Sequence, residues 1–247
     1  MSIETISDTS YLLFIRSKEV EQLTNGLNSN MKIDLQAGIN TDNSLQDIHI
    51  QLSSCEISHS YYNFTNSLNN INLFVDGSVS LQISPAHYSI YEMIDYINSS
   101  SASAFPYSAE FKPQTNKIIF TNIDSTIHTI NFSESSSLGL AKVFGFNLTD
   151  VSVGSGASII SDYSINFNVI HSLFVHTNLS IANVITSTDG NYRNILQKIP
   201  VNVPFSKVIS YNPYMSSQFS SIVNTNEIRS LEISIRDQAD RLVDFNN

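Results

Sequence analysis

Histidine and acidic side chains are the residues of this chain that could bind a metal ion or act as general acids and bases. The six histidines are His49, His59, His87, His128, His171 and His176. His171 and His176 lie five residues apart on a predicted strand. Their side chains are therefore expected on opposite faces, which disfavours a shared metal ion. His49 is expected to face solvent beside two isoleucines, and the others are isolated in the sequence. The spacing predicts no metal site.

Other candidate motifs also lack the pattern that their chemistry needs. Gly154-Ser155-Gly156 has neither the third glycine nor the strand–helix context of a phosphate-binding loop, and it is not the nucleophile elbow of a hydrolase. Asp237, Asp240 and Asp244 do not follow a calcium-loop pattern, so a solvated turn between strands is the expected structure. We therefore predict no catalytic, cofactor-binding or metal-binding residue, and no enzyme activity.

Composition limits the classes of partner. The 247 residues carry a formal net charge of −10, which argues against a nucleic-acid-binding surface. Only 14% of the residues are charged, so polarity comes mainly from Asn, Ser and Thr, which suits large assembly contacts. Cys55 is the single cysteine, so no internal disulfide is possible. The apolar run Tyr11–Ile15 is too short for a signal peptide or a membrane span, and we expect neither.

One stretch, Ser164–Thr177, is expected to be the central strand that organises the fold. Ile165, Phe167 and Val169 alternate with polar residues, which is the period of a strand with one buried face. After Val169 the alternation stops and the residues are mostly apolar. This pattern predicts a strand that passes into the middle of a packed sandwich.

The remaining elements are short and are separated by turn-forming residues. The other predicted strands are Met31–Ala37, Ile48–Ile57, Ile71–Val75, Ser78–Ile83, Tyr107–Phe111, Lys117–Thr121, Ile127–Phe132, Ile159–Ile160, Ile181–Thr186, Leu196–Val203, Lys207–Tyr211, Gln218–Val223 and Ile228–Arg236. Asp76-Gly77 between two of them predicts a hairpin with a type I′ turn. A capping box of Ser89 and Glu92 begins a helix that continues to Ile97, and Ser135–Val143 is a possible second helix.

Together these elements predict an all-β fold: an antiparallel β-sandwich of jelly-roll topology with one or two short helices. Alternating βα units are missing, which disfavours a Rossmann or barrel enzyme. Residues 1–30 are expected to be an N-terminal arm or leader, and residues 31–247 a single jelly-roll domain. The expected framework residues are Ile165, Phe167, Val169, Leu231, Ile233 and Ile235. Asn63 and Asn70 are expected to satisfy turn backbone rather than to perform chemistry.

Several elements, taken in their order, resemble a family of viral proteins. They are Ser60-Tyr61-Tyr62-Asn63-Phe64, Asn69-Asn70, His87-Tyr88-Ser89, Ile97-Asn98, Phe144-Gly145-Phe146, Leu196-Gln197-Lys198-Ile199-Pro200-Val201, and Leu231–Arg236 with Asp237 and Asp244-Phe245. In this order, over roughly Gln46 to Phe245, the chain resembles the penton, or minor capsid, proteins of virophages, Polinton-like viruses and related large double-stranded DNA viruses.

The resemblance implies a structural role. It implies a single jelly roll that forms homopentamers at the icosahedral vertices of a capsid, next to a major capsid protein. Localisation in the virion follows, with synthesis in the host cytoplasm. Members of the family usually continue past the aspartate turn into a final strand, whereas this chain stops at Asn247. A truncated chain, a different closing strand and completion by another subunit are the three alternatives.

A second class of function stays open. A carbohydrate- or receptor-binding β-sandwich, such as a fibre head or a lectin-like module, would need exposed aromatic and Asn/Asp side chains in adjacent loops. Tyr211-Asn212-Pro213-Tyr214 is the candidate stretch. The sequence does not identify a host receptor or a glycan.

Overall fold

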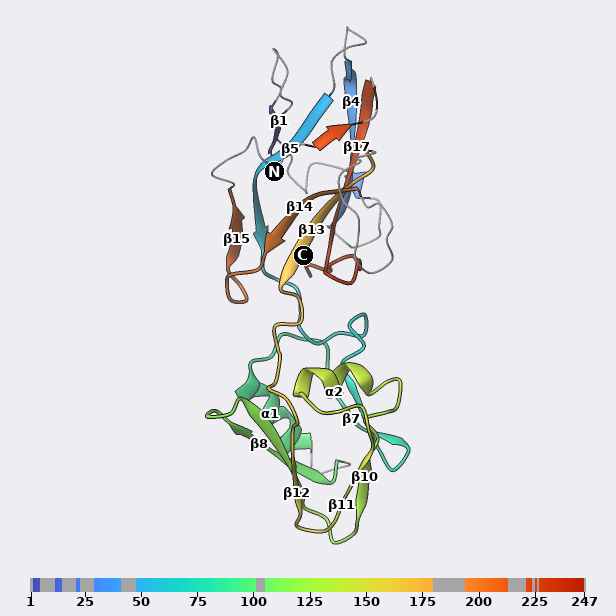
Figure 1. Ribbon diagram of the computed structural model, residues 1–247, viewed down its shortest axis with the longest axis vertical. Coiled ribbons are helices and arrows are strands. Elements are labelled where there is room, and N and C mark those ends of the chain that lie inside the picture. The colour runs from blue at the N-terminus through green and yellow to red at the C-terminus, as the bar shows by residue number, and fades with distance from the viewer. Residues whose placement is uncertain are drawn as a thin grey trace. The chain divides into compact units, whose positions relative to one another are not determined.

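The structure is a computed structural model, and it describes residues 2–4, 12–14, 21–22, 29–40, 48–100, 105–179, 194–212, 221–223, 225 and 227–246. Antiparallel strands dominate these ranges, together with the helices α1 (Ile90–Ser100) and α2 (Leu138–Phe144) (Figure 1). The chain divides into two compact units. Unit 1 comprises residues 1–61 and 170–247, and unit 2 comprises residues 62–169. The fold is all-β, as the sequence predicts.

Unit 1 consists of two antiparallel sheets. Its strands are β1 (Ser2–Glu4), β2 (Leu12–Phe14), β3 (Glu21–Gln22), β4 (Asn30–Asn40), β5 (Ile48–Ser58), β13 (Ser172–Thr177), β14 (Ile195–Pro200), β15 (Val208–Tyr211), β16 (Ser221–Val223) and β17 (Glu227–Arg236). One sheet has the order β14-β13-β17-β4-β3, and the other has the order β15-β5-β1-β2, with β16 also paired to β5. The first long strand, β4, thus lies beside the last, β17, while β5 belongs to the other sheet. Such non-sequential pairing is the connectivity of a jelly-roll sandwich.

Alternating side chains build the core of unit 1. Leu231, Ile233 and Ile235 of β17 are all less than 10% exposed, whereas the residues between them are half-buried. Leu173 and Val175 of β13 are fully buried, and β13 is central because it pairs with both β14 and β17. The predicted inward face of Leu231–Arg236 is therefore confirmed.

The predicted arm of residues 1–30 contains short strands that join these sheets. β1 pairs with β5, with Ile3 opposite Leu52, and β3 pairs with β4. The predicted domain of residues 31–247 includes all of unit 2, which lies between β5 and β13 in the sequence. A division of the chain at residue 30 stays a prediction.

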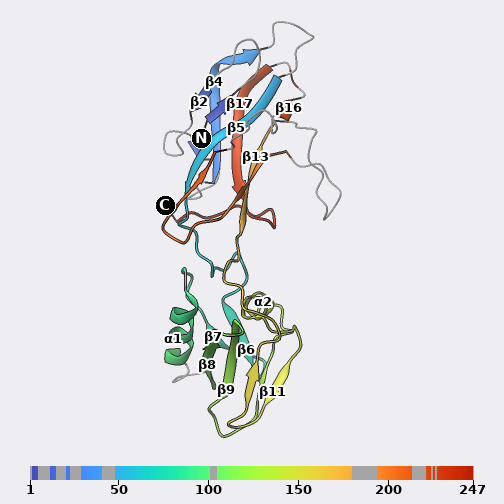
Figure 2. The same ribbon diagram turned by 60° about the vertical axis from the view of Figure 1, so that its left-hand side comes forward.

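Unit 2 has two smaller antiparallel sheets around an aromatic core. Its strands are β6 (Asn72–Val75), β7 (Ser78–Gln82), β8 (Tyr107–Lys112), β9 (Lys117–Asn122), β10 (His128–Ile130), β11 (Val151–Val153) and β12 (Ser158–Ile160). The sheet orders are β11-β10-β6-β7 and β12-β9-β8, and α1 lies against β8 (Figure 2). Phe132 and Phe146 stack in the core with ring centroids 4.5 Å apart. Met93 and Ile97 place the apolar face of α1 in the same core.

The predicted hairpin turn and the predicted capping box of unit 2 both form. Asp76 and Gly77 have φ angles of 51° and 75°, the positive values that a type I′ turn requires, and they join β6 to β7. At the start of α1, the amide of Ser89 donates to Glu92 Oε2 at 2.7 Å, and the amide of Glu92 donates to Ser89 Oγ at 3.3 Å. The capping box is therefore formed.

The predicted central strand Ser164–Thr177 is wrong over most of its length, because only Ser172–Thr177 forms a strand. The alternation is real: Ile165, Phe167 and Val169 are half-buried against the core of unit 2, and the polar residues between them are exposed. However, the amide of Ile165 donates to Asn116 O and the next amide donates to Val143 O, two different segments. An extended segment can thus bury one face without a partner strand. The six predicted framework residues consequently belong to two units, three to each.

The predicted strand Ile181–Thr186 lies outside the residues that the structure describes. The other predicted strands have a strand at the expected place within the described ranges. The second predicted helix corresponds to α2. Within those ranges, neither helix has the length and apolar composition needed to cross a membrane.

Candidate functional site

The side chains of Asp76, Asp124 and His128 form a cluster in unit 2. Asp76 lies in the β6–β7 turn, Asp124 in the loop before β10, and His128 is the first residue of β10. His128 Nδ1 is 2.6 Å from Asp76 Oδ2, and His128 Nε2 is 2.8 Å from Asp124 Oδ2. The expectation that His128 is isolated is wrong. The i, i+4 spacing of Asp124 and His128 was a visible signal, but Asp76 is 52 residues away and only the fold brings it close.

This cluster favours the charged forms of its members. The hydrogen bonds that His128 donates to Asp76 and, to a smaller extent, to Asp124 raise its pKa above the usual value. The hydrogen bond from His128 lowers the pKa of Asp76, assisted by the amide of Thr129, and it also lowers the pKa of Asp124. An imidazole with a carboxylate at each nitrogen donates from both, which requires the imidazolium form.

The geometry resembles a nucleophile–histidine–acid set but cannot work as one. Thr126 Oγ1 lies 3.0 Å from His128 Nε2, while Asp76 contacts the other ring nitrogen. A general base must present a free nitrogen lone pair to the hydroxyl. Asp124 lies closer to Nε2 than the threonine does and keeps a proton on that nitrogen. The cluster is thus suited to hold segments together rather than to activate a hydroxyl.

The other histidines do not converge on a metal site. His59 Nδ1 is 2.9 Å from Val203 O, and His176 Nε2 is 3.6 Å from Asp240 Oδ1. His171 is exposed and His49 is half-buried. Among the residues with described positions, no group of three or more His, Cys, Asp or Glu side chains could hold a metal ion.

The C-terminal acidic turn differs from the prediction at one residue. Asp237 is only 3% exposed, so a fully solvated turn is wrong there, whereas Asp244 is exposed. Asp237 Oδ1 accepts the amides of Ala239 and Arg241, and Arg241 Nη2 lies 2.7 Å from Asp237 Oδ2. A buried carboxylate needs such partners. Asp237 therefore closes the turn after β17 and has a structural role.

Asn63 and Asn70 form a buried amide network in unit 2. Asn63 Nδ2 donates to Tyr88 O at 2.9 Å and to Phe167 O at 3.3 Å, and the amide of Tyr88 donates to Asn63 Oδ1 at 2.9 Å. Asn70 Nδ2 donates to Asn63 O at 2.7 Å, and the amide of Thr65 donates to Asn70 Oδ1. Both asparagines bond to backbone groups, as predicted.

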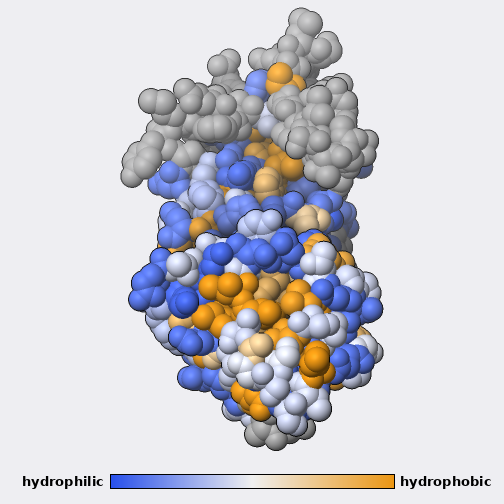
Figure 3. Space-filling model, turned by 60° about the horizontal axis from the view of Figure 1, so that its bottom comes forward, coloured by the Kyte–Doolittle hydropathy of each residue, from blue (hydrophilic) through white to orange (hydrophobic). Residues whose placement is uncertain are grey.

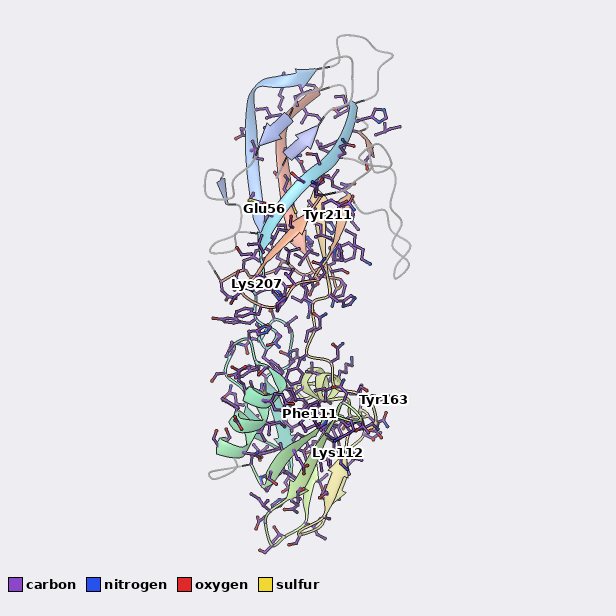
Figure 4. All side chains as sticks on the ribbon, turned by 90° about the vertical axis from the view of Figure 1, so that its left-hand side faces the viewer. Glu56, Phe111, Lys112, Tyr163, Lys207 and Tyr211 are labelled. Atoms are coloured by element: carbon purple, nitrogen blue, oxygen red, sulfur yellow. The ribbon has the colours of Figure 1, made fainter. Side chains whose placement is uncertain are left out.

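The candidate sugar-binding stretch is described only in part. Tyr211 is half-buried on β15, opposite Cys55 of β5, and Glu56 of β5 pairs with the preceding residue of β15 (Figure 4). Burial raises the pKa of Tyr211. Asn212 is exposed, and Pro213 and Tyr214 lie outside the described residues. No sugar site can be assembled from the described part of this stretch.

Apolar side chains gather on one face of unit 2 (Figure 3). The large apolar residues that unit 2 exposes are Val79, Tyr91, Ile123, Ile127, Leu148, Ile160 and Tyr163. Of these, Ile127 is 70% exposed. Exposed apolar side chains that lie together in a patch are typical of contact surfaces.

The fold class is that of an antiparallel β-sandwich of jelly-roll topology. No protein-family model matches the chain, and no curated protein matches it in sequence. Among solved structures, the chain is similar to the crystal structure of the selenomethionine-labelled mavirus penton protein, with a TM-score of 0.47 and 11% identity over 86% of this chain and 87% of that chain.

Proposed function

We propose that this protein is a structural capsid protein, a penton-type jelly roll of the kind found in virophages and related double-stranded DNA viruses. It forms homopentamers at icosahedral vertices, contacts a neighbouring major capsid protein and catalyses no reaction. The observation that carries the proposal is that polar residues of the penton-like sequence elements are buried in backbone hydrogen bonds.

In unit 2 these elements meet through the amide network. Asn63 belongs to one element and Tyr88 to another, 25 residues away, and the two are joined through both the N–H and the C=O of Tyr88. Asn70, from a third element, donates a hydrogen bond from its Nδ2 to the carbonyl of Asn63. Residues with these partners fix the path of the chain, and none of their polar atoms needs a ligand.

In unit 1 the beginning of the element Ser60–Phe64 meets the element Asp244-Phe245. Ser60 Oγ donates to Phe245 O, and Asn246 Nδ2 donates to Ser60 O at 3.0 Å. The rings of Tyr61 and Phe245 pack edge to face with centroids 6.1 Å apart. Burial raises the pKa of Tyr61 well above its usual value, as expected for a core phenol. The first and the last penton-like elements are therefore in direct contact.

The proposed assembly also fits the surface chemistry. Only 14% of residues are charged, so contacts between subunits would desolvate few charges, and the exposed apolar residues of unit 2 favour contacts with other proteins. Five copies would use heterologous contacts that close into a ring. The protein would be made in the host cytoplasm and incorporated into the virion at the capsid vertex.

Electron microscopy of the purified full chain at high concentration, combined with a glycan array, tests this proposal. Rings with five-fold symmetry and no glycan binding are expected. Particles of the size of one chain at every concentration, together with saturable binding to one class of glycan, would instead establish a carbohydrate-binding module and overturn the capsid proposal.

A further inference from the structure

The histidine cluster of unit 2 joins two segments that are distant in the sequence. Asp76 belongs to the β6–β7 turn, and its Oδ1 also accepts the amide of Thr129 at 2.8 Å. Asp124 belongs to the loop 123–127, and its Oδ1 accepts the amide of Ser125 at 2.6 Å. His128 lies between the two carboxylates. The turn and the loop are therefore held together through one imidazole ring.

This arrangement depends on the proton of that ring. A neutral imidazole carries one N–H, so it can donate to only one of the two carboxylates. Its other nitrogen would present a lone pair to a carboxylate oxygen less than 3 Å away. Loss of the proton also removes the positive charge between two negative groups, which then repel each other.

Few other groups face the ring. Thr126 Oγ1, from the loop, lies 3.0 Å from His128 Nε2 and carries no charge. Tyr107 of β8 has its ring centroid 6.5 Å from the His128 ring, and its hydroxyl donates to His128 O. On the neighbouring strand β11, the residue opposite His128 is the apolar Val153. Asp76 and Asp124 are thus the charged groups that face the ring in the described part of unit 2.

We propose that Asp76, Asp124 and His128 form a proton-dependent clamp that holds the loop 123–127 against the β6–β7 turn and releases the loop when His128 is deprotonated. The clamp is closed between two limits. At high pH it opens as His128 loses its proton, which occurs above the usual pKa because the folded-state pKa is raised. At low pH it opens as the carboxylates are protonated, which occurs below their usual pKa because theirs are lowered.

Release of the loop would change the surface of unit 2. The loop begins with Ile123 and ends with Ile127, and these side chains are 56% and 70% exposed. The loop is also anchored by Asn122, whose Nδ2 donates to Thr126 O and whose Oδ1 accepts the amide of Asp124, but the link of the loop to the β6–β7 turn needs the charged ring. Below the pKa of His128 this link fixes the position of the two isoleucines relative to the turn, and above that pKa their position varies. The clamp therefore makes one apolar contact surface dependent on pH.

NMR titration of the histidine rings in the full chain, together with amide hydrogen exchange across the same pH range, tests the clamp. We expect His128 to titrate above 6.5, the ordinary histidine value. Protection factors of the loop amides should fall by about tenfold or more through that titration, and not elsewhere in unit 2. A His128 pKa at or below the ordinary value, or loop protection that does not change with pH, would overturn the proposal.

Two variants separate the clamp from a purely structural role. Asp124→Asn removes one exposed carboxylate, so the pKa of His128 should fall and the pH dependence of loop protection should be lost. Thr126→Val, the matched control, removes an uncharged hydroxyl that contacts the same nitrogen and donates to Asp124 Oδ2 at 3.4 Å. Because both carboxylates keep their charge in this variant, the pKa of His128 and the pH dependence of loop protection should stay nearly unchanged. Equal effects of the two variants on the His128 titration would contradict the clamp.

Discussion

Replacement of Asn63 by alanine tests the framework role of the amide network most sharply. The substitution removes three hydrogen bonds: two donated to Tyr88 O and Phe167 O and one accepted from the Tyr88 amide. Each bond contributes about 0.5–1.5 kcal/mol net, and backbone groups left unpaired in a buried position cost more. Because Asn63 is only 6% exposed, water cannot freely replace these bonds. We expect the free energy of unfolding of unit 2 to fall by about 2–4 kcal/mol.

Urea unfolding followed by tyrosine fluorescence, with hydrogen exchange of the Tyr88 amide, measures this loss, since the chain has no tryptophan. Exchange at Tyr88 assigns the effect to unit 2 even if the two units unfold separately. Asn66→Ala is the matched control, because Asn66 is an exposed asparagine three residues away, and a change within about 0.5 kcal/mol is expected. A similar small change for Asn63→Ala, with Tyr88 protection intact, would refute the framework role.

Three further predictions concern packing, an edge strand and the cysteine. Gly139→Ala would place a Cβ atom 1.8 Å from Asn69 O, so it should lower the free energy of unfolding of unit 2 by about 3 kcal/mol, as measured in urea. The control Gly154→Ala, with open space around it, should be neutral. Equal stability of the two variants would contradict the close packing at Gly139. Asn98 Oδ1 accepts the amide of Ala109 of β8 at 2.7 Å, and Asn98 Nδ2 donates to Ala109 O at 3.0 Å. Asn98→Ala should therefore speed hydrogen exchange of the Ala109 amide and lower the free energy of unfolding by about 1–3 kcal/mol. Unchanged exchange would show that the edge strand β8 does not need this partner. Burial raises the pKa of Cys55 to about 11, so less of its thiol is in the reactive thiolate form. At pH 8 it should react with a disulfide reagent about 200-fold more slowly in the folded chain than in urea. Equal rates would show that Cys55 is not buried.

Local chemistry explains why parts of the fold follow from the sequence. Asp-Gly between two apolar runs specifies a type I′ turn, because both residues tolerate positive φ, and the turn forms at Asp76 and Gly77. A serine three residues before a glutamate specifies a capping box, and α1 begins there. Such signals need only neighbouring residues.

Features that depend on distant partners were not predictable in the same way. Alternation in Ser164–Val169 shows that one face is buried, but it does not show whether a partner strand or the edge of a core buries it. The sequence does not show that Asp237 will be buried beside Arg241, or that His128 will contact Asp76. The two compact units have no boundary signal in the sequence, because residues 62–169 have the same short-strand pattern as the rest. These outcomes are decided by tertiary contacts.

The proposed closed ring of five chains is tested most directly by the mass of the protein in solution. Native mass spectrometry of the full chain over a wide concentration range should find a species of about 138 kDa, which corresponds to five chains of 27.5 kDa. A single species of 27.5 kDa up to the solubility limit would contradict it.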